Sequence, residues 1–347
     1  MPRTWSRRTI AVTCLPLIVS AYAAACASHV EPTEAPWSAP LKQLWENPRD
    51  IGTRDLYNGP WGAKHAPDPN VEYTFVRNKE TGVNPGVVVT DPQGREWHVK
   101  QPPHDHSGAE GPVEVVLSRV LSAAGYHQPP VYFLPSFTMR DGSGSHRVTG
   151  GRFRLHESWM KARSEWSWQQ NPFVGMRPYQ GLLVMLLMFD SSDLKNSNNT
   201  LYDVAVGGQT ETWYVVRDLG TALGETGRLN PKRSDPDLFA RNRFVTDVRG
   251  NFVVFDYHGF HQELVSNRIE PGDVGWAASL LAQLSDRQWQ DAFRAGGYEP
   301  AIASRFIATI HTRIALGQRI GGNDWFAGVG AGASFADLAG HNRPPSE

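Results

Sequence analysis

The chain has 347 residues, of which 40% are hydrophobic, and its 12 Trp and 15 Phe are enough to fill a large core in two domains or one two-lobed domain. Its formal net charge of −1 at pH 7 argues against a broad nucleic-acid-binding surface, so we expect no nucleic acid among its partners. Its two cysteines, Cys14 and Cys26, both lie near the N-terminus, which excludes an intramolecular disulfide scaffold in the rest of the chain.

Residues 1–26 have the pattern of a signal peptide. Three arginines in the first eight residues are followed by an apolar run over 10–24 and by small residues before Cys26. The end of this segment resembles a bacterial lipoprotein cleavage box, although Ala23 stands where such boxes usually carry Leu. We therefore expect an exported protein, either periplasmic or attached to the membrane through a lipid on Cys26. Simple cleavage and an uncleaved anchor are alternatives, but the apolar run is short for a spanning helix.

Residues 27–70 are rich in proline, which predicts a tether that passes into an extended segment. The segment also holds four large apolar side chains, namely Trp45, Leu56, Tyr57 and Trp61. Because a disordered linker carries few such groups, we expect part of this segment to dock on the folded body.

Period-two alternation and short apolar runs predict three strands, at residues 71–75, 87–89 and 96–100. Two later segments, 131–137 and 152–155, have the composition to complete the same sheet. A helix is predicted from Pro112 to about Leu121, because proline suits the first helical turn and apolar residues follow at helical spacing.

The segment 181–220 holds most of the candidate catalytic and metal-binding residues. An apolar run over 182–188 predicts a buried helix, which leads into a polar loop with Asp193, Lys195 and Asn198. Two short β-like runs around Gly207-Gly208 follow the loop, and the second run ends on Asp218-Leu219-Gly220.

This arrangement resembles the catalytic core of the protein-kinase-like phosphotransferases. In that superfamily a loop with Asp, a Lys two residues on and an Asn five residues on precedes a β-hairpin and an Asp-Phe-Gly-type metal site. The resemblance covers roughly residues 71–320 and implies an α+β, two-lobed fold. The small lobe (71–160) would be an antiparallel sheet with one helix, and the large lobe (161–322) would be mainly helical.

The resemblance implies ATP and Mg²⁺ as cofactors, and it assigns roles in phosphoryl transfer to the loop and to the metal site. Asp193 would be the catalytic base, and Lys195 would lie beside the γ-phosphate. Asn198 and Asp218 would be the metal ligands. The alternative is a solvated polar turn between a core helix and a hairpin.

The same resemblance implies how the small lobe would hold the nucleotide. Lys100 would bind the phosphates and Glu114 would orient it, while a loop with Gly82 and Gly86 would cover the phosphates with backbone N–H groups. The alternatives are a surface lysine, a glutamate stabilised by the helix dipole, and a hairpin that merely carries two glycines.

Several departures separate the chain from conventional protein kinases. His98 stands where alanine usually faces the adenine, which leaves the choice of nucleotide open. Ser191 and Ser192 replace the His-Arg pair before Asp193, and no Ala-Pro-Glu sequence ends the polar segment 221–243. The chain is therefore more similar to the divergent branch that includes HipA-type kinases, phosphatidylinositol kinases and secretory-pathway kinases.

Two other functions stay open. Because ATP is scarce outside the cytoplasm, an exported chain would also suit a catalytically inactive, kinase-like binding scaffold at the cell envelope. A metal hydrolase built on His104, Asp105 and His106 would bind zinc. For a kinase-like enzyme the acceptor is equally open, and protein, lipid and small-molecule substrates all fit, as does nucleotidyl transfer.

The rest of the chain is predicted to be loop-like over 221–243 and helical afterwards. A capping box, Ser285 to Gln288, opens one helix that runs to about Arg294, and Pro300 opens another with isoleucines at helical spacing. The glycine-rich tail, 323–347, is assigned no function.

Overall fold

The computed structural model describes residues 39–79, 85–102 and 109–322, all of which belong to one compact unit, Pro36–Glu347. The predicted signal peptide with Cys26, the loop glycine Gly82, the segment His104-Asp105-His106 and the C-terminal tail lie outside the described residues. No helix in the described ranges is long and apolar enough to cross a membrane.

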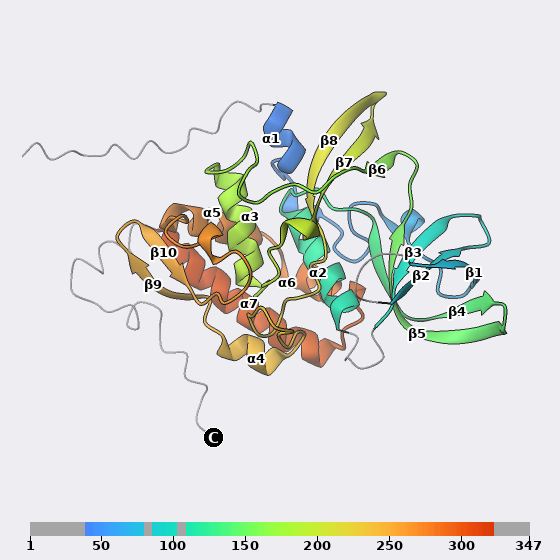
Figure 1. The fold of residues 1–347 in the computed structure, drawn as a ribbon. Coiled ribbons are helices and arrows are strands. Elements are labelled where there is room, and N and C mark those ends of the chain that lie inside the picture. The colour runs from blue at the N-terminus through green and yellow to red at the C-terminus, as the bar shows by residue number, and fades with distance from the viewer. Residues whose placement is uncertain (1–38, 80–84, 103–108, 323–347) are drawn as a thin grey trace, which may run out of the picture. The chain divides into compact units, whose positions relative to one another are not determined.

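Five strands form a closed barrel in the order β1-β2-β3-β5-β4 (Figure 1). They are β1 (Glu72–Asn78), β2 (Gly86–Thr90), β3 (Glu96–Lys100), β4 (Val131–Asp141) and β5 (Gly144–Leu155). All neighbours are antiparallel except β1 and β4, which pair in parallel and close the barrel. The prediction of a purely antiparallel sheet missed this parallel pair and the closure of the barrel. Closure is possible because the 11-residue strand β4 is long enough to pair with both β5 and β1.

The alternation of β3 decides which side chains leave the barrel. Trp97 and Val99 are buried in the barrel core, so Glu96, His98 and Lys100 project from its outer surface. On the neighbouring strand β5, Arg152 lies opposite Lys100 and Arg154 lies opposite His98. The outer surface of this strand pair is therefore strongly charged.

Helix α2 (Glu110–Ala123) connects β3 to β4, and Pro112 lies in its first turn as predicted. Its apolar residues belong to the large core that the helical part of the chain shares. The other long helices of that core are α3 (Arg177–Met188), α5 (Pro271–Leu281), α6 (Asp286–Ala295) and α7 (Pro300–Gly321) (Figure 1). The predicted capping box of α6 is present, with Ser285 and Gln288 bonding each other's backbone N–H.

The proline-rich segment reaches the same core. Helix α1 (Ala39–Leu44) is followed by Trp45, whose indole Nε1 donates a 2.7 Å hydrogen bond to the carbonyl of Ala124. Leu44 and Trp45 are buried, as are Ile51 and Leu56 further along. Single 3₁₀ turns occur at Ile51–Thr53, Ala63–His65, Asn196–Asn198 and Gln262–Leu264.

The predicted hairpin around Gly207-Gly208 is present as β7 (Asn199–Val206) and β8 (Gln209–Val216), with β6 (Met160–Ala162) at its edge. Both turn glycines have positive φ, 57° and 82°, which a two-residue turn of type I′ requires. This hairpin separates the polar loop at Asp193 from Asp218.

Two expectations about the C-terminal half are wrong. The segment 221–243 contains a short helix, α4 (Pro236–Arg241), because Asp235 caps the free N–H groups of Asp237 and Leu238. The part after it is not all helical, since β9 (Val245–Arg249) and β10 (Phe252–Phe255) pair as a hairpin. Neither strand alternates between buried and exposed residues, so the sequence carries no period-two signal for them. The described chain is thus an α+β protein.

Candidate active site

Lys100 is surrounded by carboxylates. Its Nζ lies 3.0 Å from a carboxylate oxygen of Glu110, 3.5 Å from Asp218 and 3.8 Å from Glu114, and only 10% of its side chain is exposed. Burial alone would lower the pKa of Lys100, but the charges of Glu114, Asp218 and Glu110 raise it above its usual value. Lys100 therefore carries a full positive charge at neutral pH.

Two acids one helical turn apart on α2 share Lys100. Glu114, the residue predicted from sequence, also lies 3.2 Å from Nε of Arg152 and is almost fully buried. Glu110 was not predicted, although it is the nearer partner of Lys100. The signal was available in the sequence, because an i, i+4 spacing places both acids on one helix face.

Asp218 follows β8 in a left-handed conformation with φ of 50°, an uncommon conformation for a residue with a side chain. Burial tends to raise the pKa of Asp218, but the charges of Lys100 and Arg217 outweigh it and lower the pKa below its usual value. The side chain is 43% exposed, so the ionised carboxylate is open to a ligand.

Gly220 explains why the turn after Asp218 lies so close to α2. A Cβ at this position would come within 2.8 Å of the backbone carbonyl oxygen of Glu110, which is too close for any side chain. The glycine therefore allows the backbone of the Asp-Leu-Gly segment to approach the first turn of α2.

The loop after α3 places its three predicted residues together. The Lys195 ammonium lies 2.8 Å from Asp193, and it also stands 4.2 Å from the ring centroid of Phe260. The Asn198 side-chain N–H donates a 2.7 Å hydrogen bond to the backbone carbonyl of Asp193. Because that amide nitrogen is engaged, the Asn198 side-chain oxygen is the atom left to face a cation.

A backbone hydrogen bond joins the loop to Asp218. The N–H of Arg217, the residue before Asp218, donates to the carbonyl of Asn198 at 2.8 Å, at the open end of the β7–β8 hairpin. Ser192 anchors the other end of the loop through backbone bonds to Thr221 and Phe260. The hairpin thus brings the candidate metal ligands Asn198 and Asp218 to the same end of two paired strands.

Gly86, predicted to cover phosphates, begins β2. A Cβ there would lie 2.7 Å from the carbonyl oxygen of Val99 on β3, so close packing of the two strands accounts for this glycine. Its predicted partner Gly82 lies outside the described residues.

Four cations near this site were not predicted: Lys79, Arg152, Arg154 and Arg217. Burial and the charge of Lys100 lower the pKa of Lys79, and burial and nearby cations also lower the pKa of Arg154. Arg152 is 6% exposed and lies directly across the strand pair from Lys100. With Lys100 itself and with Arg233, which pairs with Glu110, six cations among the described residues lie around three acids, and such an excess of positive charge favours a polyanionic ligand.

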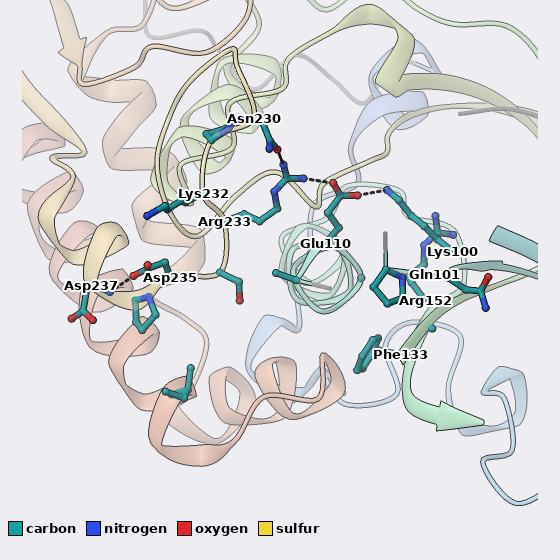
Figure 2. Close-up of a pocket in the computed structure, with 18 of the residues that line it drawn as sticks. Lys100, Gln101, Glu110, Phe133, Arg152, Asn230, Lys232, Arg233, Asp235 and Asp237 are labelled. Atoms are coloured by element: carbon teal, nitrogen blue, oxygen red, sulfur yellow. Dashed lines mark hydrogen bonds and ion pairs between the residues drawn. The ribbon is translucent and has the colours of Figure 1, made fainter. Parts of the chain in front are cut away.

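A cavity of about 580 Å³ lies beside this site, between the end of β3, the first turn of α2 and residues 230–237 (Figure 2). Figure 2 shows that Arg233 links Asn230 to Glu110, which in turn contacts Lys100. Asp193, Asn198 and Asp218 do not line the cavity. It therefore shares Lys100, Glu110 and Arg152 with the candidate active site but does not include the loop at Asp193.

No protein-family model matches the chain, and no curated protein matches its sequence. Two solved kinases are similar in structure. The Helicobacter pylori proinflammatory kinase CtkA has 12% identity and a TM-score of 0.35, over 71% of this chain and 98% of that chain. The Golgi casein kinase has 12% identity and a TM-score of 0.28, over 72% of this chain and 76% of that chain. Neither likeness defines a family for this chain.

Proposed function

We propose that the chain is a Mg²⁺- and ATP-dependent phosphotransferase of the protein-kinase-like type. The observation that carries the proposal is the approach of Lys100 to Asp218 at 3.5 Å, with Glu114 at 3.8 Å from the same ammonium. In such enzymes a lysine and an aspartate bind the same nucleotide. The lysine binds phosphate oxygens, and the aspartate holds the metal ion that bridges them. The closeness of residues that are far apart in the sequence supports the proposal.

The residues present suit both cofactors. Asp218 and Asn198 offer a carboxylate and an amide oxygen, which are ligands that Mg²⁺ prefers, and the lowered pKa of Asp218 keeps it ionised. The triphosphate of ATP carries several negative charges, which the excess of cations around Lys100 and Arg152 would balance. When bound, Mg²⁺ would neutralise charge on the phosphates.

Each side chain then has a task in the transfer. Asp193 accepts the proton of the attacking hydroxyl, and Lys195, paired with it at 2.8 Å, balances charge beside the moving phosphoryl group. Lys100 binds phosphate oxygens, while Glu114 and Glu110 hold its ammonium in place. Asn198 fixes the loop through the Asp193 carbonyl.

We extend the proposal to the finer features that the sequence implies. The barrel with α2 would be the small lobe and residues 161–322 the large lobe of a divergent kinase-like protein. It would act outside the cytoplasm, in the periplasm or attached to the membrane through Cys26, on a protein, lipid or small-molecule acceptor.

Thermal stability in the presence of ATP tests the proposal. ATP with Mg²⁺ should raise the melting temperature of the wild-type protein, and ATP alone should raise it less. Asp218→Asn should remove the Mg²⁺-dependent part, while the control Asp247→Asn, in β9, should keep it. A protein that ignores ATP under all conditions would instead be the inactive scaffold.

A further inference from the structure

Three side chains that have no assigned role in phosphotransfer converge on the outer surface of the barrel, on the same face of β3 as Lys100. Within the described ranges, Glu96, His98 and His156 form a group whose possible ligand atoms all lie within 4.8 Å of one another. Glu96 and His98 belong to β3, and His156 comes directly after β5.

The backbone fixes the three positions. Glu96 and His98 are two residues apart on one strand, so their side chains leave the same face. The N–H of His156 donates a 2.9 Å hydrogen bond to the carbonyl of Glu96, which continues the pairing of β3 with β5. All three residues are therefore held by the barrel itself rather than by a loop.

The distances suit a small metal ion. A carboxylate oxygen of Glu96 lies 3.3 Å from Nε2 of His98. Two ligands of a tetrahedral ion, each about 2.0–2.1 Å from the metal, are separated by roughly 3.3–3.4 Å. The rings of His98 and His156 have centroids 5.7 Å apart. A small rotation of the His156 side chain therefore brings one of its ring nitrogens to the ion that Glu96 and His98 would bind.

We propose that Glu96, His98 and His156 bind a divalent transition-metal ion, with zinc as the occupant. Two imidazoles and one carboxylate are a common protein ligand set for Zn²⁺, and three protein ligands leave a fourth position open for water or another ligand. Mg²⁺ prefers oxygen ligands, so this site differs in chemistry from Asn198 and Asp218. The inference does not depend on the proposed phosphotransfer.

The exposure of the three ligands and the two nearby arginines both affect how tightly the site binds a metal ion. The side chains of Glu96 and His98 are 30% and 34% exposed and His156 is exposed, so an ion enters without unfolding the barrel. Arg77 lies 3.4 Å from Glu96, and Arg154 is the cross-strand neighbour of His98. Both cations oppose metal binding, so removing Arg77 strengthens it.

The experiment is titration calorimetry of the full chain with Zn²⁺ after treatment with a chelator. The expected wild-type result is one site in the barrel, which His156→Ala and His98→Ala each weaken at least tenfold, because each removes one of three ligands. Arg77→Ala should bind Zn²⁺ several-fold more tightly. Far-ultraviolet circular dichroism of each variant confirms that the barrel is intact.

Two controls separate this site from others. His258→Ala removes an exposed histidine that pairs with Asp256 at 3.1 Å and, among the described residues, has no third metal-binding side chain close by. His104→Ala with His106→Ala removes the other histidine pair that sequence suggests as a zinc site. Both controls should leave the barrel site unchanged. Wild-type affinity in His156→Ala, or loss of all zinc binding with the His104 and His106 changes, would overturn the proposal.

Discussion

Arg313 of α7 donates two parallel hydrogen bonds to the carboxylate of Asp190, at 2.9 and 3.0 Å, and both side chains are buried. The same guanidinium donates to the carbonyls of Met188 and Phe239, each at 2.8 Å. Asp190 therefore joins the end of α3 to α7. Although it stands only three residues before Asp193, its role is to hold the structure.

Asp190→Asn should destabilise the fold. It leaves the buried Arg313 without its counter-charge, and breaking a buried ion pair costs about 3–5 kcal/mol in the free energy of unfolding. Urea denaturation measures this change. A variant that is as stable as wild type but cannot turn over ATP would move the catalytic base from Asp193 to Asp190.

Asp193→Asn should behave in the opposite way. A base acts in the transition state, so the substitution should abolish turnover while ATP affinity and stability stay near wild type. Steady-state phosphate release and calorimetric ATP binding give the two quantities. A large loss of ATP affinity would show instead that Asp193 serves in binding.

Glu114 and Glu110 should differ when each is changed to glutamine. Glu114 is buried between Lys100 and Arg152, so Glu114→Gln leaves two buried cations short of negative charge and should reduce both stability and ATP affinity. Glu110 is 21% exposed, and Glu110→Gln frees Lys100 and Arg233 at the rim of the cavity. It should lower stability less than Glu114→Gln does, because Glu110 is the more exposed of the two acids. Equal losses in the two variants would contradict this ranking.

Asp91 should give part of the stability a defined pH dependence. Its carboxylate accepts hydrogen bonds from the Trp97 indole at 3.0 Å and from the Arg95 guanidinium at 2.7 Å. Burial raises the pKa of Asp91, but these donors outweigh it and hold the pKa below the ordinary value of 3.8. The stabilisation is thus complete above about pH 5 and is lost as the pH falls through the lowered folded-state pKa.

Denaturation of wild type and Asp91→Asn across this range measures the effect. Near neutral pH the wild type should be more stable by about 2 kcal/mol, because hydrogen bonds to a charged group are lost in the variant. The difference should shrink as the carboxylate of the wild type becomes protonated. A constant difference down to the most acid point would show that the charge of Asp91 does not contribute.

The strands β1 to β3, helix α2 and the β7–β8 hairpin were predictable because their signals are local. Alternation, Pro112 in a first turn and the Gly207-Gly208 pair each act within a few residues. The parallel pairing of β1 with β4 was not predictable, since it joins segments distant in sequence through backbone bonds that leave no side-chain pattern. Strands β9 and β10 were missed for another reason, because neither alternates between buried and exposed residues and so neither gives a period-two signal.

In the candidate site, too, the residues with a local sequence signal were predictable and those brought in by the fold were not. Lys100, Asp193 and Asp218 stand in recognisable spacings, and the structure brings Lys100 and Asp218 together. The i, i+4 spacing of Glu110 and Glu114 is visible in the sequence, but it does not show that this face of α2 meets Lys100. Arg152 has no such spacing, and its importance depends on the register that places it opposite Lys100. The cluster of Glu96 with His98 and His156 depends likewise on the strand register.

The most direct test of the account is release of the γ-phosphate of ATP by Lys100→Ala in the presence of Mg²⁺. Each acid around Lys100 keeps a second cation, such as Arg233 at Glu110 and Arg152 at Glu114, so the variant should still fold, at some cost in stability because the ammonium is buried. Its rate at sub-saturating ATP should fall at least a hundredfold, by about 3 kcal/mol of lost phosphate binding in the transition state. The control Lys161→Ala, on the exposed edge of β6, should keep the wild-type rate. Unchanged phosphate release by Lys100→Ala would contradict the assignment of this site to phosphotransfer.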